Sequence, residues 1–237
     1  MLVNKFNSHQ EAAAAAGETL NSLLISNKDT PVLLMLSGGS SFSVLEYAGD
    51  EGLTENLTIS MLDKRFNQDP DVNNFLQLQK LEFYERALKK HVNFTGTLPR
   101  PGELMDDIKI RFELALKNWK NANPKGKIFA TFGIGADGHT AGIFPYPDNP
   151  AFFNEAFENQ HWVMAYFAKG KHKHEQRITT TFTFFKLIDE AIVFICGDDK
   201  KIAFEKFIKG NGQPHELPAL GIHQTKHQQI FTDIISN

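Results

Sequence analysis

Short apolar runs that alternate with helix-like segments constrain the fold of this 237-residue chain most strongly. Each run has about five or six residues, is apolar nearly throughout and is bounded by turn residues, which is typical of strands buried on both faces. The predicted strands are 32–37, 57–62, 128–132, 162–167 and 191–196, and the predicted helices are 10–24, 75–89, 104–119 and 200–208. This alternation predicts an α/β fold, with a mostly parallel sheet between two layers of helices.

Three further segments complete this prediction. Ser8 precedes the first helix as a candidate N-cap. Residues 179–185 (TTTFTFF) have strand propensity, and 93–102, with two prolines and two glycines, reads as a loop. Because the chain shows no internal repeat and no low-complexity linker, we expect residues 1–237 to form a single domain.

The composition limits which binding partners and which cellular compartment we expect for this protein. The formal net charge is −3 and the pI near 6.3, so no basic face for nucleic acid is expected. We interpret Lys169, Lys171 and Lys173 as a solvated stretch rather than a polyanion site.

Cys196 is the only cysteine, lies in an apolar run and is expected to be a buried thiol. No signal-peptide pattern or membrane-length apolar run is present, so we expect a cytoplasmic protein without membrane contact.

The first predicted strand runs into a glycine-rich loop, Ser37-Gly38-Gly39-Ser40, followed by a helix-like segment over 42–47. A strand, a glycine turn and a helix start bring unpaired backbone N–H groups together, which suits an anion such as phosphate. An ordinary tight turn with a serine cap explains the same residues equally well. The lysine of a nucleotide-binding P-loop is missing, so ATP is not implied.

The second predicted strand ends in Asp63, Lys64 and Arg65, and Asn73 and Asn74 follow after a polar turn. An exposed ion pair would contribute little. Arginine also suits a substrate clamp, because its guanidinium matches phosphate and carboxylate oxygens. The position at a strand end slightly favours the clamp.

The third predicted strand runs into the segment 133–140, GIGADGHT. It contains G-x-G-x-x-G, but the prolines that follow prevent a crossover helix, and no acidic residue ends a next strand at the expected distance, so a dinucleotide site is disfavoured. The glycines would instead hold Asp137 and His139 in a bend. A histidine oriented by a carboxylate is a good general base near neutral pH, which favours a catalytic role for His139 over a structural one.

The other histidines carry weaker patterns. His172 and His174 have a spacing that could bind a metal on a strand, but no cysteine or acid completes a set. A solvated loop is the favoured interpretation, and no metal site is predicted.

Taken together, the three loops resemble the 6-phosphogluconolactonase family, whose superfamily includes glucosamine-6-phosphate deaminases. LSGGSS is similar to that family's first glycine loop, and DKRFNQDPDVNNFLQL to its DER-to-SN segment. GIGADGHTAGIFP is similar to its signature G-x-G-x-D-G-H-T-A-S-L-F-P. Residues 176–179 (QRIT) and AIVFICGDDK match its R-[IV]-T and G-x-x-K elements, so the likeness spans essentially the whole chain.

The resemblance implies a three-layer αβα, Rossmann-like fold of the sugar-phosphate isomerase/deaminase/lactonase type, with a helix starting at Thr179. It implies hydrolysis of 6-phospho-D-glucono-1,5-lactone to 6-phosphogluconate without a cofactor or metal, by a monomer or homodimer. His139 would activate water, with Asp137 orienting it and Arg65 near the phosphate or the developing oxyanion. The residues implied to bind substrate or phosphate are Ser37, Gly38, Gly39, Ser40, Asp63, Asn74, Gly135, Arg177 and Lys200.

Four residues depart from the family pattern. Lys64 replaces Glu, Asn73 replaces Ser, Gly142 replaces Ser and Tyr146 replaces Gly. We expect Lys64, which reverses a charge beside the site, to be the departure most able to alter substrate preference.

Three other functions remain as alternatives. A deaminase would carry a glutamate five residues after the histidine, where this chain has Phe144, and phenylalanine cannot transfer a proton. A non-catalytic sugar-phosphate sensor would be expected to lose the base, yet Asp137 and His139 are both present. A nicotinamide-dependent oxidoreductase is the third alternative, which binding of nicotinamide would support.

Overall fold

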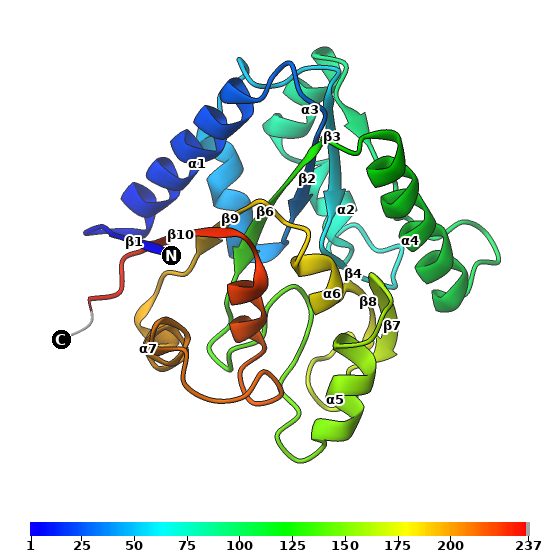
Figure 1. The fold of residues 1–237 in the computed structure, drawn as a ribbon, viewed down its shortest axis with the longest axis vertical. Coiled ribbons are helices and arrows are strands. Elements are labelled where there is room, and N and C mark those ends of the chain that lie inside the picture. The colour runs from blue at the N-terminus through cyan, green and yellow to red at the C-terminus, as the bar shows by residue number, and fades with distance from the viewer. Residues whose placement is uncertain (236–237) are drawn as a thin grey trace.

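A computed structural model of the chain describes residues 1–235 and places a parallel seven-stranded sheet at its centre (Figure 1). Every neighbouring pair of strands in this sheet is parallel. From edge to edge the strands are β1 (Leu2–Lys5), β10 (His227–Thr232), β9 (Glu190–Phe194), β6 (Lys127–Gly133), β2 (Val32–Leu36), β3 (Leu57–Met61) and β5 (Asn93–Phe94). After β2 the chain builds outward through β3 and β5, and then returns to the other side of β2 with β6. The direction in which strands are added therefore reverses between β2 and β6. Open α/β sheets bind their ligands at such a topological switch point.

Alternate residues of the buried strands face two separate cores, which gives the fold three layers. Val32, Leu34 and Leu36 belong to one apolar cluster, whereas Leu33 and Met35 belong to the other. On the first face lie α1 (His9–Ser26), the 3₁₀ helix η1 (Gly39–Tyr47), α2 (Asn74–Leu78) and α3 (Glu82–Lys89). On the second lie α4 (Met105–Ala122), α5 (Pro150–Phe157), α6 (Phe182–Phe185), α7 (Lys201–Lys209) and η3 (Pro218–Gln224). The predicted α/β class is confirmed.

A second, antiparallel sheet of three strands borders the switch point. Its order is β4 (Asp63–Arg65), β8 (Gln176–Thr180) and β7 (Val163–Phe167). The strand predicted at 162–167 therefore exists but belongs to this small sheet. Phe167 of β7 is half-exposed, which agrees with a strand that is not covered on both faces. In the register of β4 and β8, Arg65 lies opposite Arg177.

Several boundaries differ from the predicted ones. The predicted helix 75–89 is two helices, because α2 ends at Leu78 and α3 begins at Glu82. The segment 179–185 is strand only to Thr180 and helix from Phe182, so neither the strand propensity nor the implied helix start at Thr179 was right for all of it. The helix forms here because its phenylalanines pack into the second core.

Three other expectations agree with the structure: the cap of the first helix, the buried thiol and the exposed lysines. Ser8 caps α1, since its hydroxyl accepts a hydrogen bond from the Glu11 N–H at 3.1 Å. Cys196 is a buried free thiol, and burial raises its pKa to about 12. The three lysines of the 169–173 stretch are exposed. Within residues 1–235, none of the helices combines the length and apolar character that crossing a membrane would require.

Candidate active site

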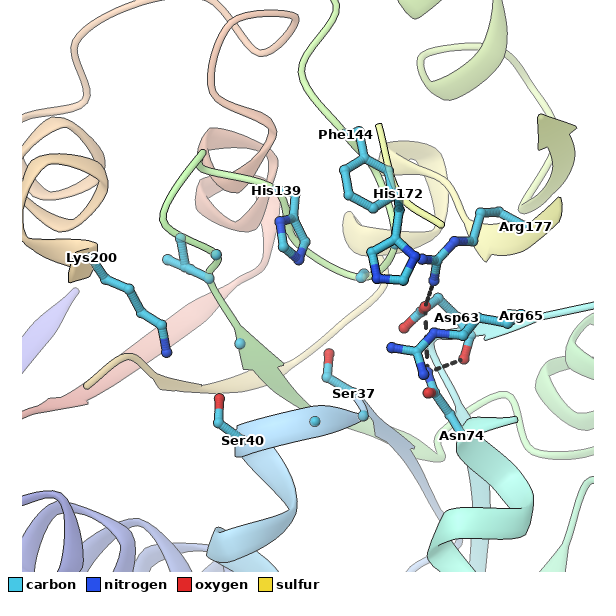
Figure 2. A pocket seen from close by; sticks show the side chains of 17 residues that line it. Ser37, Ser40, Asp63, Arg65, Asn74, His139, Phe144, His172, Arg177 and Lys200 are labelled. Carbon is cyan, nitrogen blue, oxygen red and sulfur yellow. Dashed lines mark hydrogen bonds and ion pairs between the residues drawn. The ribbon is translucent and has the colours of Figure 1, made fainter. Parts of the chain in front are cut away.

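A cavity of about 260 Å³ opens where the carboxyl ends of β2, β3, β6 and β9 meet (Figure 2). It brings together nearly every residue that the sequence singled out. The predicted residues on its wall are Ser37, Gly38, Gly39, Ser40, Asp63, Arg65, Asn74, Gly135, His139, Arg177 and Lys200. Asp137 does not line the cavity and lies behind His139 instead.

The loop after β6 is folded around the imidazole of His139. The Gly135 N–H donates to the His139 carbonyl at 2.9 Å, and the Gly138 N–H donates to the Gly135 carbonyl at 2.9 Å. A side chain at Gly135 would overlap the His139 ring, and Gly138 has φ +82°, a conformation that favours glycine. Both glycines therefore serve the placement of one side chain, and not a dinucleotide.

Asp137 fixes the orientation of the His139 ring. Its Oδ1 lies 2.5 Å from Nδ1 of His139 and 3.1 Å from the backbone nitrogen of the same residue. Burial alone would raise the pKa of Asp137, but the hydrogen bonds and charge of His139 outweigh it and leave this pKa below its ordinary value. An ionised Asp137 holds the proton on Nδ1, so Nε2 of His139 has a free lone pair.

Two side chains of the small sheet hold the segment that follows His139. The Thr179 hydroxyl donates to the Ala141 carbonyl at 2.5 Å, and the Tyr166 hydroxyl donates to the Gly142 carbonyl. Gly142 has φ +68°, and an added Cβ would come within 2.7 Å of the Asp63 carboxylate. The absence of a side chain at Gly142 therefore leaves room for Asp63.

Asp63 and Arg177 form a buried pair on one wall. Oδ2 of Asp63 lies 3.7 Å from a guanidinium nitrogen of Arg177, and the Asn74 amide donates to the same oxygen at 3.4 Å. Burial raises the pKa of Asp63 against the opposing effect of Arg177, Arg65 and His139, and burial also lowers the pKa of Arg177. The free-energy cost of desolvating the two charges therefore exceeds the attraction between them at 3.7 Å. This balance is typical of a binding site rather than of a stabilising salt bridge.

Three buried polar atoms beside this pair have no hydrogen-bond partner in the described part of the chain: Oγ of Ser37, Oδ1 of Asn74 and Nε of Arg65. All three residues line the cavity, and Ser37 and Asn74 are only 5% and 3% exposed. Buried polar groups are almost always satisfied in folded proteins. Such atoms at a cavity therefore indicate a polar ligand.

The glycine loop forms another wall. The Ser37 N–H donates to the Thr131 carbonyl of β6 at 3.1 Å, which ties the loop to the switch point. η1 begins at Gly39, and the N–H groups of its first turn have no carbonyl of their own helix to bond. Lys200 reaches the cavity from beyond β9, on the side of Ser40 and opposite Arg177 (Figure 2).

Lys64 does not lie in the cavity, contrary to the expectation that it changes the charge beside the substrate. Side chains alternate along β4, so Asp63 and Arg65 face the cavity while Lys64 faces away. Its Nζ donates to the Thr97 carbonyl at 2.5 Å and lies 5.1 Å from the centre of the Phe112 ring. Burial, with Arg111 nearby, holds the pKa of Lys64 far below its usual range.

The sequence prediction did not assign Phe144 and His172 to the site, although both side chains lie on the cavity wall. The Phe144 ring lies 4.9 Å from the His139 ring, and the Arg177 guanidinium lies 5.3 Å from the Phe144 centre. His172 does lie in a loop, as expected, but it is half-buried and turned into the cavity. Only the H-x-H spacing drew attention to it. No cluster of His, Cys, Asp or Glu that could hold a metal ion occurs among the described residues.

Residues 7–232 match the family model described as glucosamine-6-phosphate isomerases/6-phosphogluconolactonase. The 6-phosphogluconolactonases of two Helicobacter pylori strains are each 27% identical over 215 residues, which is 87% of this chain and 84% of theirs. The structure of a 6-phosphogluconolactonase from Shewanella baltica superposes with a TM-score of 0.75 at 16% identity, covering 98% of this chain and 97% of that one. A monomeric glucosamine-6-phosphate deaminase superposes with a TM-score of 0.68 at 17% identity, covering 98% and 97%. The fold alone therefore does not separate the two activities.

Proposed function

Because the chain belongs to the glucosamine-6-phosphate isomerase/6-phosphogluconolactonase family, we propose that it hydrolyses 6-phospho-D-glucono-1,5-lactone to 6-phosphogluconate, a step of the oxidative pentose phosphate pathway. The observation that carries this proposal is the environment of His139. Its Nδ1 is hydrogen-bonded to Asp137, and its Nε2 has no hydrogen-bond partner among residues 1–235, at a cavity lined by cations. Such a base can remove a proton from water at neutral pH.

The reaction then needs only groups that the cavity supplies. Nε2 of His139 takes a proton from water while the oxygen attacks the lactone carbonyl at C1. The negative charge on the carbonyl oxygen would be stabilised by Arg65, which lines the same wall as Arg177. Collapse of the tetrahedral intermediate breaks the bond between C1 and the ring oxygen, which takes the proton back from the imidazolium. The product acid then ionises, and no redox change occurs.

The charges of the cavity support a phosphorylated substrate. Among the described residues on the wall, Arg65, Arg177 and Lys200 supply three cations, whereas Asp63 is the one carboxylate. A phosphate dianion over the loop from Ser37 to Ser40 would receive backbone N–H donors from η1, with Lys200 on one side and Arg177 on the other. We assign these residues to phosphate binding, with Asp63, Asn74 and Gly135 at the sugar.

We propose a monomer or a homodimer, since each residue to which the mechanism assigns a role belongs to the same chain. The proposed chemistry uses no cofactor. A phosphorylated substrate carries charges that retain it in the compartment where it is made, so the enzyme must act in that compartment, which we propose to be the cytoplasm.

Phe144 argues against the deaminase alternative. It stands where the resemblance to deaminases requires a glutamate, it is buried, and its ring packs against His139. A proton relay through an acid at this position is therefore not available. Lactone hydrolysis needs one base, which His139 provides.

The test is hydrolysis of the lactone, generated in situ, by the wild type and by His139→Ala. We expect the variant to lose roughly 10²- to 10⁴-fold in kcat with little change in KM, as for removal of a general base. His9→Ala, which removes an exposed histidine at the start of α1, is the matched control. Phosphosugar binding by the wild type without acceleration above spontaneous hydrolysis would instead indicate a sensor. Unchanged turnover in His139→Ala would refute the assignment of the base.

A further inference from the structure

His172 is a cavity residue that the proposed hydrolysis leaves without a role. It lies in the loop between β7 and β8, and Figure 2 shows its ring beside the Arg177 guanidinium, on the wall that carries Asp63. Its ring centre lies 6.2 Å from that of Phe144, with 32° between the planes, and 5.5 Å from that of His174. The side chain is therefore held between aromatic neighbours and faces the cavity.

One hydrogen bond fixes the tautomer of His172. Its Nδ1 lies 3.0 Å from the backbone nitrogen of His174, whose N–H donates to it. A ring nitrogen that accepts a hydrogen bond carries no proton, so the proton of the neutral ring is on Nε2. His172 therefore presents a fixed N–H donor to the cavity, whereas His139 presents a lone pair.

The surroundings of His172 keep the ring neutral. Burial comes first, and the charges of Arg177, Arg65, His174 and His139 add to it, so that the pKa of His172 falls to about 4. A neutral imidazole at working pH is neither a cation for the phosphate nor a proton donor of useful acidity. Its use is therefore as a directional hydrogen-bond donor to an oxygen of the bound substrate.

We propose that His172 is a specificity-determining residue that donates its Nε2–H to a hydroxyl oxygen of the bound sugar lactone. This inference rests on the proposed function and deepens it by assigning a sugar-binding subsite. A hydroxyl group both donates and accepts, and acceptors lie on the same wall. Asp63 offers its carboxylate, and Oδ1 of Asn74 is buried without a partner among residues 1–235. A hydroxyl between these groups and His172 would be bonded on both sides.

A pair of variants separates the N–H donor from the ring. His172→Phe keeps a ring that can pack on Phe144 and removes the donor, and we expect kcat/KM for the lactone to fall about 5- to 15-fold, as for loss of one neutral hydrogen bond. His172→Gln carries an N–H near the position of Nε2 and should stay within about 3-fold of wild type. His174→Phe is the matched control, because it makes the same change two residues away, outside the cavity wall, and keeps the backbone N–H.

The 2-, 3- and 4-deoxy analogues of the phosphorylated lactone identify the contacted hydroxyl. We expect the ratio of wild-type to His172→Phe kcat/KM to fall to about 1 for one analogue and to persist for the other two. The ratio for the full substrate should be the same from pH 5.5 to 8.5, because a neutral donor does not titrate there.

Three results would overturn the inference while the proposed function stands: wild-type kcat/KM in His172→Phe, an equal ratio for the full substrate and all three analogues, or a ratio that changes with pH over this range. Failure of the wild type to accelerate lactone hydrolysis at all would instead refute the proposed function, and the inference with it. A thermal melt of each variant checks that a lowered rate does not come from unfolding.

Discussion

Asp137 and His139 are joined by two hydrogen bonds to one oxygen, since Oδ1 accepts from Nδ1–H at 2.5 Å and from the backbone N–H at 3.1 Å. The backbone bond closes a tight turn, and the side-chain bond sets the rotation and tautomer of the imidazole. Residues two apart in a glycine-rich loop can therefore act as a preset pair without help from another element.

Asp137→Asn tests this pair. An asparagine can turn its amide N–H toward Nδ1, which would then accept, and the proton of the neutral imidazole would move to Nε2. Because Nε2 is the proposed base, we expect kcat to fall by roughly 10- to 10³-fold with little change in KM. Steady-state kinetics of lactone hydrolysis measure this effect. Asp148→Asn, an exposed change in the following loop, is the control, and an equal loss in both would mean that Asp137 does not orient the base.

Gly135→Ala tests the space around the imidazole. The new methyl group would overlap the His139 ring and come within 2.9 Å of Oδ1 of Asp137. We expect His139 to be displaced and kcat to fall about 10- to 100-fold, since small misplacements of a catalytic group are costly. Gly96→Ala is matched, because a Cβ there meets no atom within 4 Å. Wild-type kcat in Gly135→Ala would show that the base does not need this placement.

The sequence predicted the frame of the site well, for a physical reason. β2, β3, β6 and β9 are buried on both faces, so their apolar runs stand out, and the carboxyl ends of parallel neighbours must lie at one edge of the sheet. The loops that begin near Ser37, Asp63 and Gly133 are therefore brought together by topology alone. The histidine and its carboxylate lie within one loop, so their pairing is local as well.

The features of the site that the sequence did not reveal depend on a very short strand or on pairing between segments that are distant in the sequence. β4 has only three residues, too few for a periodic signal, and so the orientation of Lys64 away from the cavity was not predicted. β8 pairs with β4 across more than a hundred residues, and this pairing brings Arg177 beside Asp63. His172 lies in the loop before β8 and faces the cavity. No local sequence pattern indicates that orientation.

Arg177→Ala and Lys200→Ala test phosphate binding from the two walls. We expect each to raise KM for the lactone by about 10-fold or more, because each would remove a charge-assisted bond to the phosphate, with a smaller effect on kcat. The two variants should differ in stability. Arg177→Ala leaves Asp63 buried without its cation and should lower the melting temperature, whereas Lys200→Ala should not.

The exposed Lys173→Ala is the control for loss of a positive charge near the site. An unchanged KM in both Arg177→Ala and Lys200→Ala would refute the phosphate assignment. Inhibition by inorganic phosphate gives a second measurement, since it should weaken in these two variants and stay as in the wild type in Lys173→Ala.

Lys64→Met tests whether Lys64, which replaces the glutamate of the family pattern, affects substrate preference or the stability of the fold. Because Lys64 faces away from the cavity, we expect kcat/KM to stay within about 3-fold of the wild type, for the lactone and for its deoxy analogues alike. A larger or analogue-dependent change would show that Lys64 does tune substrate preference. A methionine has a similar length and removes an amine whose charged form is disfavoured by burial.

Stability against pH supplies the second part of this test. The pKa of Lys64 is lowered in the folded chain, so between this lowered pKa and the ordinary value near 10.5 the unfolded chain holds a proton that the folded chain has released. The free energy of unfolding contributed by Lys64 therefore rises with pH up to that value, by at most about 1.4 kcal/mol per pH unit, and falls as the pH is lowered. We expect urea unfolding between pH 6 and 10 to show that Lys64→Met stabilises the protein most at the acidic end and progressively less toward pH 10. A difference in stability that did not change with pH would mean that Lys64 keeps its proton in the folded protein.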